Sequence, residues 1–146
     1  MATVTILMGS KSDMDVMKKA ADFLIEHDID VDMHVASAHR NPDKVHSICK
    51  EVEAHGDVVI TGAGMAAHLG GVVASLVTKP VIAVPVGSSS LGGLDALLAT
   101  VQMPSGIPVA TVAINGSKNA AILAMEILAL KDSAIKEKLI AFRKTF

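Results

Sequence analysis

The stretch TVTILMGSKSDMDVMKKAADFLIEHDIDVDMHVA, residues 3–36, contains the pattern that decides the fold. Residues 3–7 are apolar or β-branched, which is typical of a buried strand. From Met14 to Ile25 the apolar residues recur at helical spacing, and charged residues occupy the opposite face. Residues 31–36 predict a second strand. A strand, a helix and another strand in this order form the repeating unit of a parallel sheet.

The same alternation continues along the rest of the chain. Asn41 and Pro42 suit the N-cap and the first turn of a second helix, whose apolar stripe runs from Val45 to Val52. Further strands are predicted at residues 57–61, 81–84 and 109–113, and further helices at 66–77, 94–102, 118–130 and 133–144. We therefore expect one α/β domain over residues 1–146, with a doubly wound parallel sheet and an added C-terminal helix.

Composition narrows the class of function. The chain has 146 residues, 51% of them hydrophobic, but no run of eighteen apolar residues, so no membrane span is predicted. A net charge of −2 and an aromatic content of 2% disfavour nucleic-acid binding. The single Cys49 excludes an internal disulfide and fits a reducing compartment. Because the first residues also lack a basic signal-peptide region, we expect a cytoplasmic protein.

The segments that follow the strands are rich in glycine, serine and histidine. In a sheet of this kind ligands bind beyond the carboxyl ends of the strands. The four segments are MGSKSDMD at 8–15, ASAHRN at 36–41, TGAGMAAHLGG at 61–71 and PVGSSSLGGLD at 85–95. Residues 9–12 lead into a helix N-terminus, which favours an anion. The alternative is that Ser12 or Asp13 only caps that helix.

Histidine positions single out two side chains. His39 and His68 occupy segments that follow strands and would converge on one crevice, so they are the candidates for proton transfer. The remaining histidines are expected to be structural: His27, His34, His46 and His55. Cys49 lies on a core-facing stripe and is not expected to act as a nucleophile.

Three common kinds of site are not supported by the motifs. No H-x-x-x-H or C-x-x-C spacing occurs, so a metal site is not predicted. GAGMAA, residues 62–67, matches the dinucleotide pattern, but the acidic residue about 20 positions later is missing. GSKSD lacks the spacing of a phosphate-binding P-loop. We therefore exclude NAD and ATP as cofactors.

Five motifs carry a resemblance to a known family. MGSKSD, SAHR, GAGMAAHL, GLDALL and VQMPSGIPVATVAI, in this order, resemble the N5-carboxyaminoimidazole ribonucleotide mutase family of purine biosynthesis (class I PurE) over residues 5–130. The resemblance implies a three-layer flavodoxin-like fold, a homo-octamer and a small ribonucleotide substrate. It also implies transfer of a carboxylate from an exocyclic nitrogen to ring carbon 4 of an aminoimidazole, with no metal and no organic cofactor.

The resemblance implies roles for individual residues. His39 matches the catalytic imidazole, and His68 is the next candidate for the acid and base. Ser10, Ser37 and Arg40 match the residues that bind the substrate phosphate, and Asp13 matches the residue that binds the ribose hydroxyls. The pocket for the migrating carboxylate is matched by Ser12, Gly64, Ala67, His68 and Leu69. A guanidinium can clamp phosphate with a planar fork of donors, and an imidazole beside it can exchange a proton with the base.

Two functions other than the mutase remain as alternatives. The first is the related carboxylase that uses free carbon dioxide. There SAHR resembles SAHK and the Ala-Ala-His of the third loop is replaced, so Arg40 and His68 favour the mutase. The second is a non-catalytic module that binds a nucleotide phosphate.

Some positions depart from the pattern of the family. Met65 and Asn115 stand where glycine is common, Gly70 stands where proline often occurs, and the segment VGSSSLGG differs from the sequence usual in the family.

Assembly is predicted from residues 118–130. They contain AAILAMEILAL, which is apolar nearly all round a helix. Such a helix must be buried on several sides, and a small domain offers little cover. The pattern predicts a homo-oligomer, an octamer if the family resemblance holds.

Overall fold

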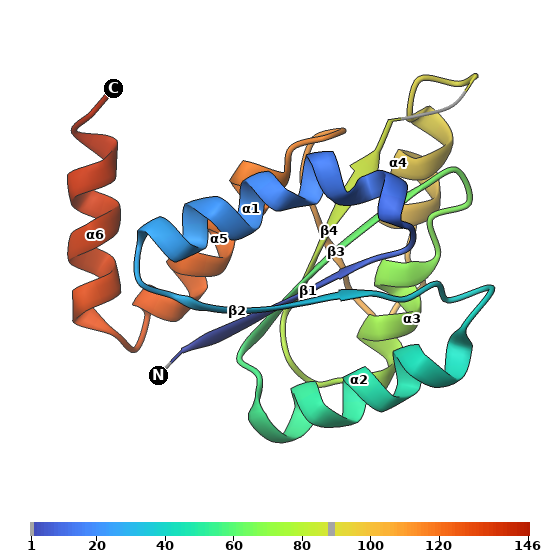
Figure 1. The fold of residues 1–146 in the computed structure, drawn as a ribbon, viewed down its shortest axis with the longest axis horizontal. Helices are drawn as coiled ribbons and strands as arrows, with labels where there is room; N and C mark the ends of the chain where they lie inside the picture. Colours follow the sequence, from blue (N-terminus) through green and yellow to red (C-terminus); the bar gives the residue numbers. More distant parts are fainter. Residues whose placement is uncertain (1, 88–89) are drawn as a thin grey trace.

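A computed structural model describes residues 2–87 and 90–146, and it contains one parallel sheet (Figure 1). The strands are β1 (Thr3–Met8), β2 (Asp30–Val35), β3 (Val58–Gly64), β4 (Val81–Val86) and β5 (Ala110–Thr111). Their spatial order is β2-β1-β3-β4-β5, and each neighbouring pair is parallel. This is the order of flavodoxin-like folds. The prediction of a doubly wound parallel sheet is confirmed.

Helices cover both faces of the sheet (Figure 1). The helices are α1 (Met14–Glu26), α2 (Pro42–His55), α3 (Leu69–Leu76), α4 (Leu94–Val101), α5 (Ser117–Ala129) and α6 (Ser133–Arg143). α1 and α5 share one face, α2 and α3 the other, and α4 lines a pocket together with α3. α6 packs on α5 outside the first layer. The result is the three-layer arrangement with an added C-terminal helix.

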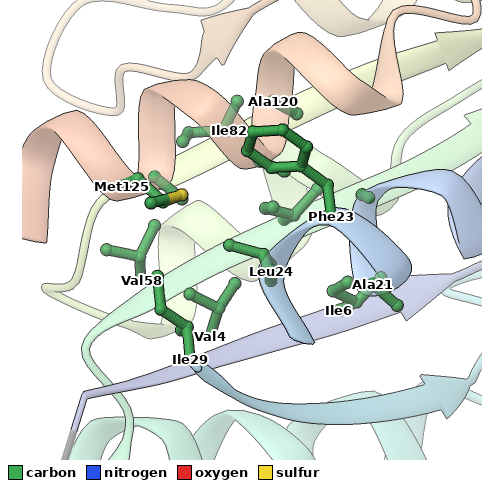
Figure 2. Packing of buried hydrophobic residues seen from close by; sticks show 14 of the residues in the cluster. Val4, Ile6, Ala21, Phe23, Leu24, Ile29, Val58, Ile82, Ala120 and Met125 are labelled. Carbon is green, nitrogen blue, oxygen red and sulfur yellow. The ribbon is translucent and has the colours of Figure 1, made fainter. Parts of the chain in front are cut away.

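Residues of the central strands β1, β3 and β4 alternate between two cores, which explains why these three strands are buried on both faces. Ile6, Ile60 and Ile82 belong to the larger core, and Figure 2 shows Phe23 and Met125 in the same cluster. Their neighbours Leu7, Val59 and Val81 point to the other face and pack with α2 and α3. Both cores place the strand ends rigidly beneath the loops that carry the predicted site.

Some element boundaries differ from the sequence prediction. α3 begins at Leu69 rather than at residue 66, because Met65 has a left-handed backbone with φ 51° and the chain turns before the helix. β5 covers only Ala110–Thr111 of the predicted 109–113, and β3 extends to Gly64 instead of residue 61. A short 3₁₀ helix, η1 (Lys11–Asp13), was not predicted. The other boundaries agree within two residues.

α5 is covered within its own chain. It packs against α1, α6, β3 and β4, and Ala120, Ala121, Ala124 and Met125 are fully buried. The apolar surface of α5 therefore does not by itself require a second protein chain. Among the described residues, none of the helices has the length and hydropathy needed to cross a membrane. Ser88 and Ser89 of the VGSSSLGG segment lie outside the described residues.

Candidate active site

A cavity of about 490 Å³ opens at the carboxyl ends of β1, β2 and β3. In this sheet the chain order reverses between β1 and β3, and such a reversal is where α/β proteins bind ligands. The lining residues are Gly9, Ser10, Ser12, Asp13, Ser37, Ala38, His39, Arg40, Ala63, Gly64, Met65, Ala66, His68 and Leu69. Segments far apart in the sequence thus form one crevice.

Nine of the ten residues singled out from the sequence line this cavity. The exception is Ala67, which is buried behind the wall, where its carbonyl oxygen accepts a hydrogen bond of 3.5 Å from the Thr100 hydroxyl. Sequence reasoning placed Gly9 only in the predicted anion-binding segment 9–12, and it assigned no binding role to the remaining lining residues, which are Ala38, Ala63, Met65 and Ala66. Each of these residues is next to a predicted site residue in the sequence, and this position is the feature from which a place in the cavity lining could have been predicted.

The first loop is ordered by its own side chains. The Ser10 hydroxyl oxygen accepts from the Ser12 amide at 3.3 Å and from the Ser12 hydroxyl at 3.0 Å. The Asp13 carboxylate accepts from the Ser10 amide at 3.1 Å, which completes a capping box. Ser10 therefore caps η1, whereas Asp13 is the N-cap residue of α1 and makes no side-chain capping hydrogen bond there. Because the Ser10 oxygen already accepts two bonds, its own hydrogen is left to donate toward the crevice.

Asp13 is the ionisable side chain that is buried in this loop, with 5% of its surface exposed. Burial raises the pKa of its carboxyl group above the ordinary value of 3.8, because the charged form loses hydration. The hydrogen bond from the Ser10 amide and the positive charge of Arg40 act in the opposite direction on this pKa. Asp13 therefore sits where a further hydrogen-bond donor, such as a ligand hydroxyl, would stabilise its charge.

Hydrogen-bond donors from the second loop face the same crevice. The Arg40 amide donates to the Ser37 hydroxyl oxygen at 3.1 Å, and one Arg40 guanidinium nitrogen donates to the Gly9 carbonyl at 3.4 Å. The Arg40 side chain is exposed, so its remaining N–H groups are accessible to a ligand. Ser10, Ser37 and Arg40 together offer hydroxyl and guanidinium donors, the set that binds an anionic phosphate.

His39 and His68 meet across the crevice. His39 Nε2 lies 2.8 Å from His68 Nδ1, and the two rings are nearly perpendicular, with centroids 4.8 Å apart. One nitrogen of this contact must carry a hydrogen while the other presents a lone pair. Which of the two nitrogens donates depends on the tautomers of the rings. The structure brings together the two histidines that the sequence singled out.

The other histidines lie outside the lining of this cavity. His27 Nδ1 is 2.8 Å from the Phe23 carbonyl oxygen, and His34 Nε2 is 2.7 Å from the Asp32 carboxylate. His46 and His55 lie on α2, within the helix and at its last residue. The contacts of His27 and His34 are of the kind that a structural histidine makes; the structural roles of His46 and His55 stay predictions.

Two chemical alternatives find no support in residues 2–87 and 90–146. No group of three or more histidine, cysteine, aspartate or glutamate side chains is arranged there to hold a metal ion. Cys49 is buried, and burial raises the pKa of its thiol to about 11. A thiol with this pKa stays protonated near neutral pH and is a poor nucleophile.

A family model described as AIR carboxylase matches residues 3–146. The chain belongs to the AIR carboxylase family. Its relatives in this family include the N5-carboxyaminoimidazole ribonucleotide mutase of Pyrococcus abyssi, 54% identical over 145 residues that cover 99% of this chain and 83% of the relative. The enzyme of the same name from Methanocaldococcus jannaschii is 58% identical over 141 residues, which cover 97% and 88%. The predicted family resemblance is confirmed.

Solved structures agree with this assignment to the AIR carboxylase family. The crystal structure of Treponema denticola PurE superposes with a TM-score of 0.91 at 37% identity, covering 99% of this chain and 91% of that one. This match confirms the flavodoxin-like three-layer fold. A 3-dehydroquinate dehydratase-like protein from Bifidobacterium longum has a TM-score of 0.57 at 14% identity, covering 88% and 99%, which shows a likeness of fold alone.

Proposed function

We propose that the protein is a mutase of purine biosynthesis that converts N5-carboxyaminoimidazole ribonucleotide to 4-carboxy-5-aminoimidazole ribonucleotide. The relatives that carry this enzyme name support the proposal. The observation that carries it is the His39–His68 contact of 2.8 Å, placed in a crevice beside the exposed guanidinium of Arg40. A proton-transfer pair next to an anion site fits a phosphorylated substrate that is rearranged by proton movement.

The substrate is bound, in this proposal, from its phosphate inward. Arg40 clamps the phosphate, with hydroxyl donors from Ser10 and Ser37. Asp13 accepts hydrogen bonds from the ribose hydroxyls, which stabilise its buried charge. The migrating carboxylate lies in the pocket formed by Ser12, Gly64, Leu69 and His68, with Ala67 supporting the wall from behind. The base then lies beside His39.

The proposed reaction uses His39 twice. His39 donates a proton to the exocyclic nitrogen of the carbamate, the bond from that nitrogen to the carboxylate carbon breaks, and its electron pair stays on nitrogen. Carbon dioxide is released beside 5-aminoimidazole ribonucleotide. Ring carbon 4, made electron-rich by the amine, attacks carbon dioxide and forms the new carbon–carbon bond. The proton on carbon 4 then passes to His39, which is restored.

Retention of carbon dioxide is the step that separates a mutase from a carboxylase. In the proposed closed site the reactants stay together, so that recombination is effectively intramolecular. Arg40 and the Ala66-Ala67-His68 sequence favour this mode over use of free carbon dioxide, because the related carboxylase differs at both places. His68 is the second candidate for the acid and base, since it contacts His39 directly.

A turnover assay with two substrates tests the proposed function. Purified protein should convert N5-carboxyaminoimidazole ribonucleotide without added bicarbonate, and ¹⁴C-bicarbonate should enter the product poorly. Efficient turnover of aminoimidazole ribonucleotide with bicarbonate, with heavy labelling of the product, would favour the carboxylase. Binding of either ribonucleotide without turnover would leave the non-catalytic module as the function.

We also propose that the protein works as a homo-octamer in the cytoplasm. Leu94, Leu98 and Val101 form an exposed apolar stripe on α4, at i, i+4 and i+7, with exposed fractions of 53%, 50% and 43%. A stripe of this kind is typical of a surface that a second copy covers. The single Cys49, which forms no disulfide within the chain, fits a reducing compartment.

A further inference from the structure

Met65 has an unusual combination of backbone and exposure. Its φ is 51°, in the left-handed region that long side chains seldom adopt. Its side chain is 60% exposed, although it is large and apolar, and it lines the crevice. Backbone strain at a ligand crevice is a reason to look for a function of the residue that carries it.

The surrounding chain holds Met65 in this conformation. On one side, β3 remains paired with β4 up to Gly64, which lies opposite Val86. On the other side, the Ala67 amide donates to the Met65 carbonyl at 2.9 Å, and the His68 amide donates to the Ala66 carbonyl at 2.8 Å. The tight turn fixes the direction in which the Met65 side chain leaves the crevice wall, three residues before His68.

The crevice lacks an aromatic side chain larger than imidazole. The chain has no Trp or Tyr, and its three Phe residues contact one another in a series elsewhere, Phe23 with Phe142 and Phe142 with Phe146. Apart from the imidazoles of His39 and His68, a flat heteroaromatic base that enters the crevice therefore finds no aromatic ring to stack on. A methionine thioether is polarizable and flexible, and it makes favourable contacts with aromatic rings.

We propose that Met65 folds over the aminoimidazole base of the bound substrate, a contact that deepens, and rests on, the proposed function. Its exposed side chain then adds an apolar cover to the crevice lining. The same cover keeps water out and slows escape of carbon dioxide between its release and its recapture. Met65 is thus a specificity-determining residue that recognises the base rather than the phosphate.

Binding measurements with two ligands distinguish a contact of Met65 to the base from a contact to the phosphate. Titration calorimetry with 5-aminoimidazole ribonucleotide should show Met65→Ala binding roughly 2- to 10-fold more weakly than the parent, the range of a sulfur–aromatic contact. Ribose 5-phosphate, which lacks the base, should bind both proteins equally. Met65→Leu, which keeps an apolar side chain of similar length, should retain most of the parental affinity. Equal weakening for both ligands, or no weakening, would overturn the proposal.

Retention of carbon dioxide gives a second readout that is independent of the amount of folded protein. During conversion of N5-carboxyaminoimidazole ribonucleotide in ¹⁴C-bicarbonate, the label per product molecule should rise several-fold in Met65→Ala and Met65→Gly. The label should stay near the parental value in Met65→Leu. An unchanged ratio in the two small variants would remove Met65 from the retention step.

Two controls complete the experiment. Leu130→Ala truncates another exposed apolar side chain, outside the cavity lining, and should change neither readout. Met65→Gly removes the side chain and also relieves the left-handed backbone. If Met65→Gly kept the parental affinity and label per product molecule while Met65→Ala lost them, backbone strain would explain the effect, and the proposal that Met65 covers the base would be wrong. If the parent shows no turnover, the proposed function fails, and the comparison of ribonucleotide with ribose 5-phosphate still decides whether Met65 contacts a base.

Discussion

At the scale of single residues, His39 is proposed to act as both the acid and the base of the reaction. Replacing it by Asn keeps the size and some hydrogen bonding, but an amide cannot act as an acid and a base near neutral pH. His39→Asn should bind ribonucleotide nearly normally while turnover falls by roughly 100- to 10,000-fold. Steady-state kinetics measures the drop. His34→Asn, which alters a histidine paired with Asp32 outside the cavity lining, should keep the parental rate. A near-parental rate in His39→Asn would leave His68 as the next candidate.

Arg40 is expected to act on binding rather than on folding. Arg40→Ala removes a charge-assisted contact to phosphate, so the Kd for ribonucleotide should rise by roughly 30- to 150-fold, about 2–3 kcal/mol. The side chain is exposed, so the midpoint of thermal unfolding should change little. Calorimetric titration measures the affinity for ribonucleotide, and a thermal melting curve measures the midpoint of unfolding. Unaltered affinity would show that the phosphate binds elsewhere.

Asp13 predicts a specific pH dependence of stability. Its pKa in the folded protein is raised above 3.8 by burial, so the folded state holds this proton more tightly than the unfolded chain does. The contribution of Asp13 to stability therefore falls as the pH rises from about 3.8 through the raised pKa. Asp13→Asn keeps an oxygen acceptor for the Ser10 amide but cannot ionise, so this slope should disappear. Unfolding free energies across this pH range compare the two; parallel curves would contradict the prediction.

Loop residues show what the sequence could and could not predict about the site. Family motifs and positions after strands identified His39, His68 and Arg40, because side chains at the ends of parallel strands converge. The capping box of Ser10 and Asp13 was missed, since the 3₁₀ helix that it caps has only three residues and no periodicity. The left-handed backbone at Met65 was also not predicted, although glycine, which adopts positive φ readily, is common at this position in the family.

At the scale of elements, boundaries were predictable where packing and local pattern agree. α1 has an apolar stripe against the sheet and an opposite charged face, and its predicted extent agrees with the structure. α3 was placed three residues too early, since the alanines of GAGMAAHL favour a helix but lie in the turn between Met65 and Leu69. β5 was placed over five residues but pairs only at Ala110 and Thr111. Residues 109–113 are half-buried or exposed, so the apolar pattern there predicted neither the burial nor the length of the strand.

The N-terminus of α6 offers a test of local stability. The Asp132 carboxylate accepts hydrogen bonds from the Ala134 amide at 3.0 Å and the Ile135 amide at 3.3 Å. Asp132→Ala should lower the free energy of unfolding by about 1 kcal/mol, the usual value of an N-cap. Asp132→Asn, which keeps a capping oxygen, should lose less. Urea denaturation measures both, and an equal loss in the two variants would assign the effect to charge instead of to the cap.

At the scale of the whole molecule, the sheet order explains why the chemistry gathers in one place. The crevice lies where the strand order reverses between β1 and β3, and α1 with α5 cover one face of the sheet while α2 with α3 cover the other (Figure 1). The alternation of strands and helices was sufficient to predict this architecture. The position of α6 was not predictable, because the apolar surface of α5 fits its own chain as well as it fits a partner.

The stripe on α4 therefore carries the prediction of assembly. Leu94, Leu98 and Val101 are about half exposed, and exposing them in water is unfavourable by the hydrophobic effect. If a second copy covers the stripe, light scattering at micromolar concentration should report an oligomer, eight chains in the proposed assembly. Leu98→Glu should shift the mass toward smaller species, because a buried unpaired carboxylate is strongly unfavourable at an interface. Ile25→Glu makes the same change at an exposed apolar residue of α1 and should leave the oligomer intact. A monomeric parent would contradict the assembly, and an unchanged mass in Leu98→Glu would place the interface away from α4.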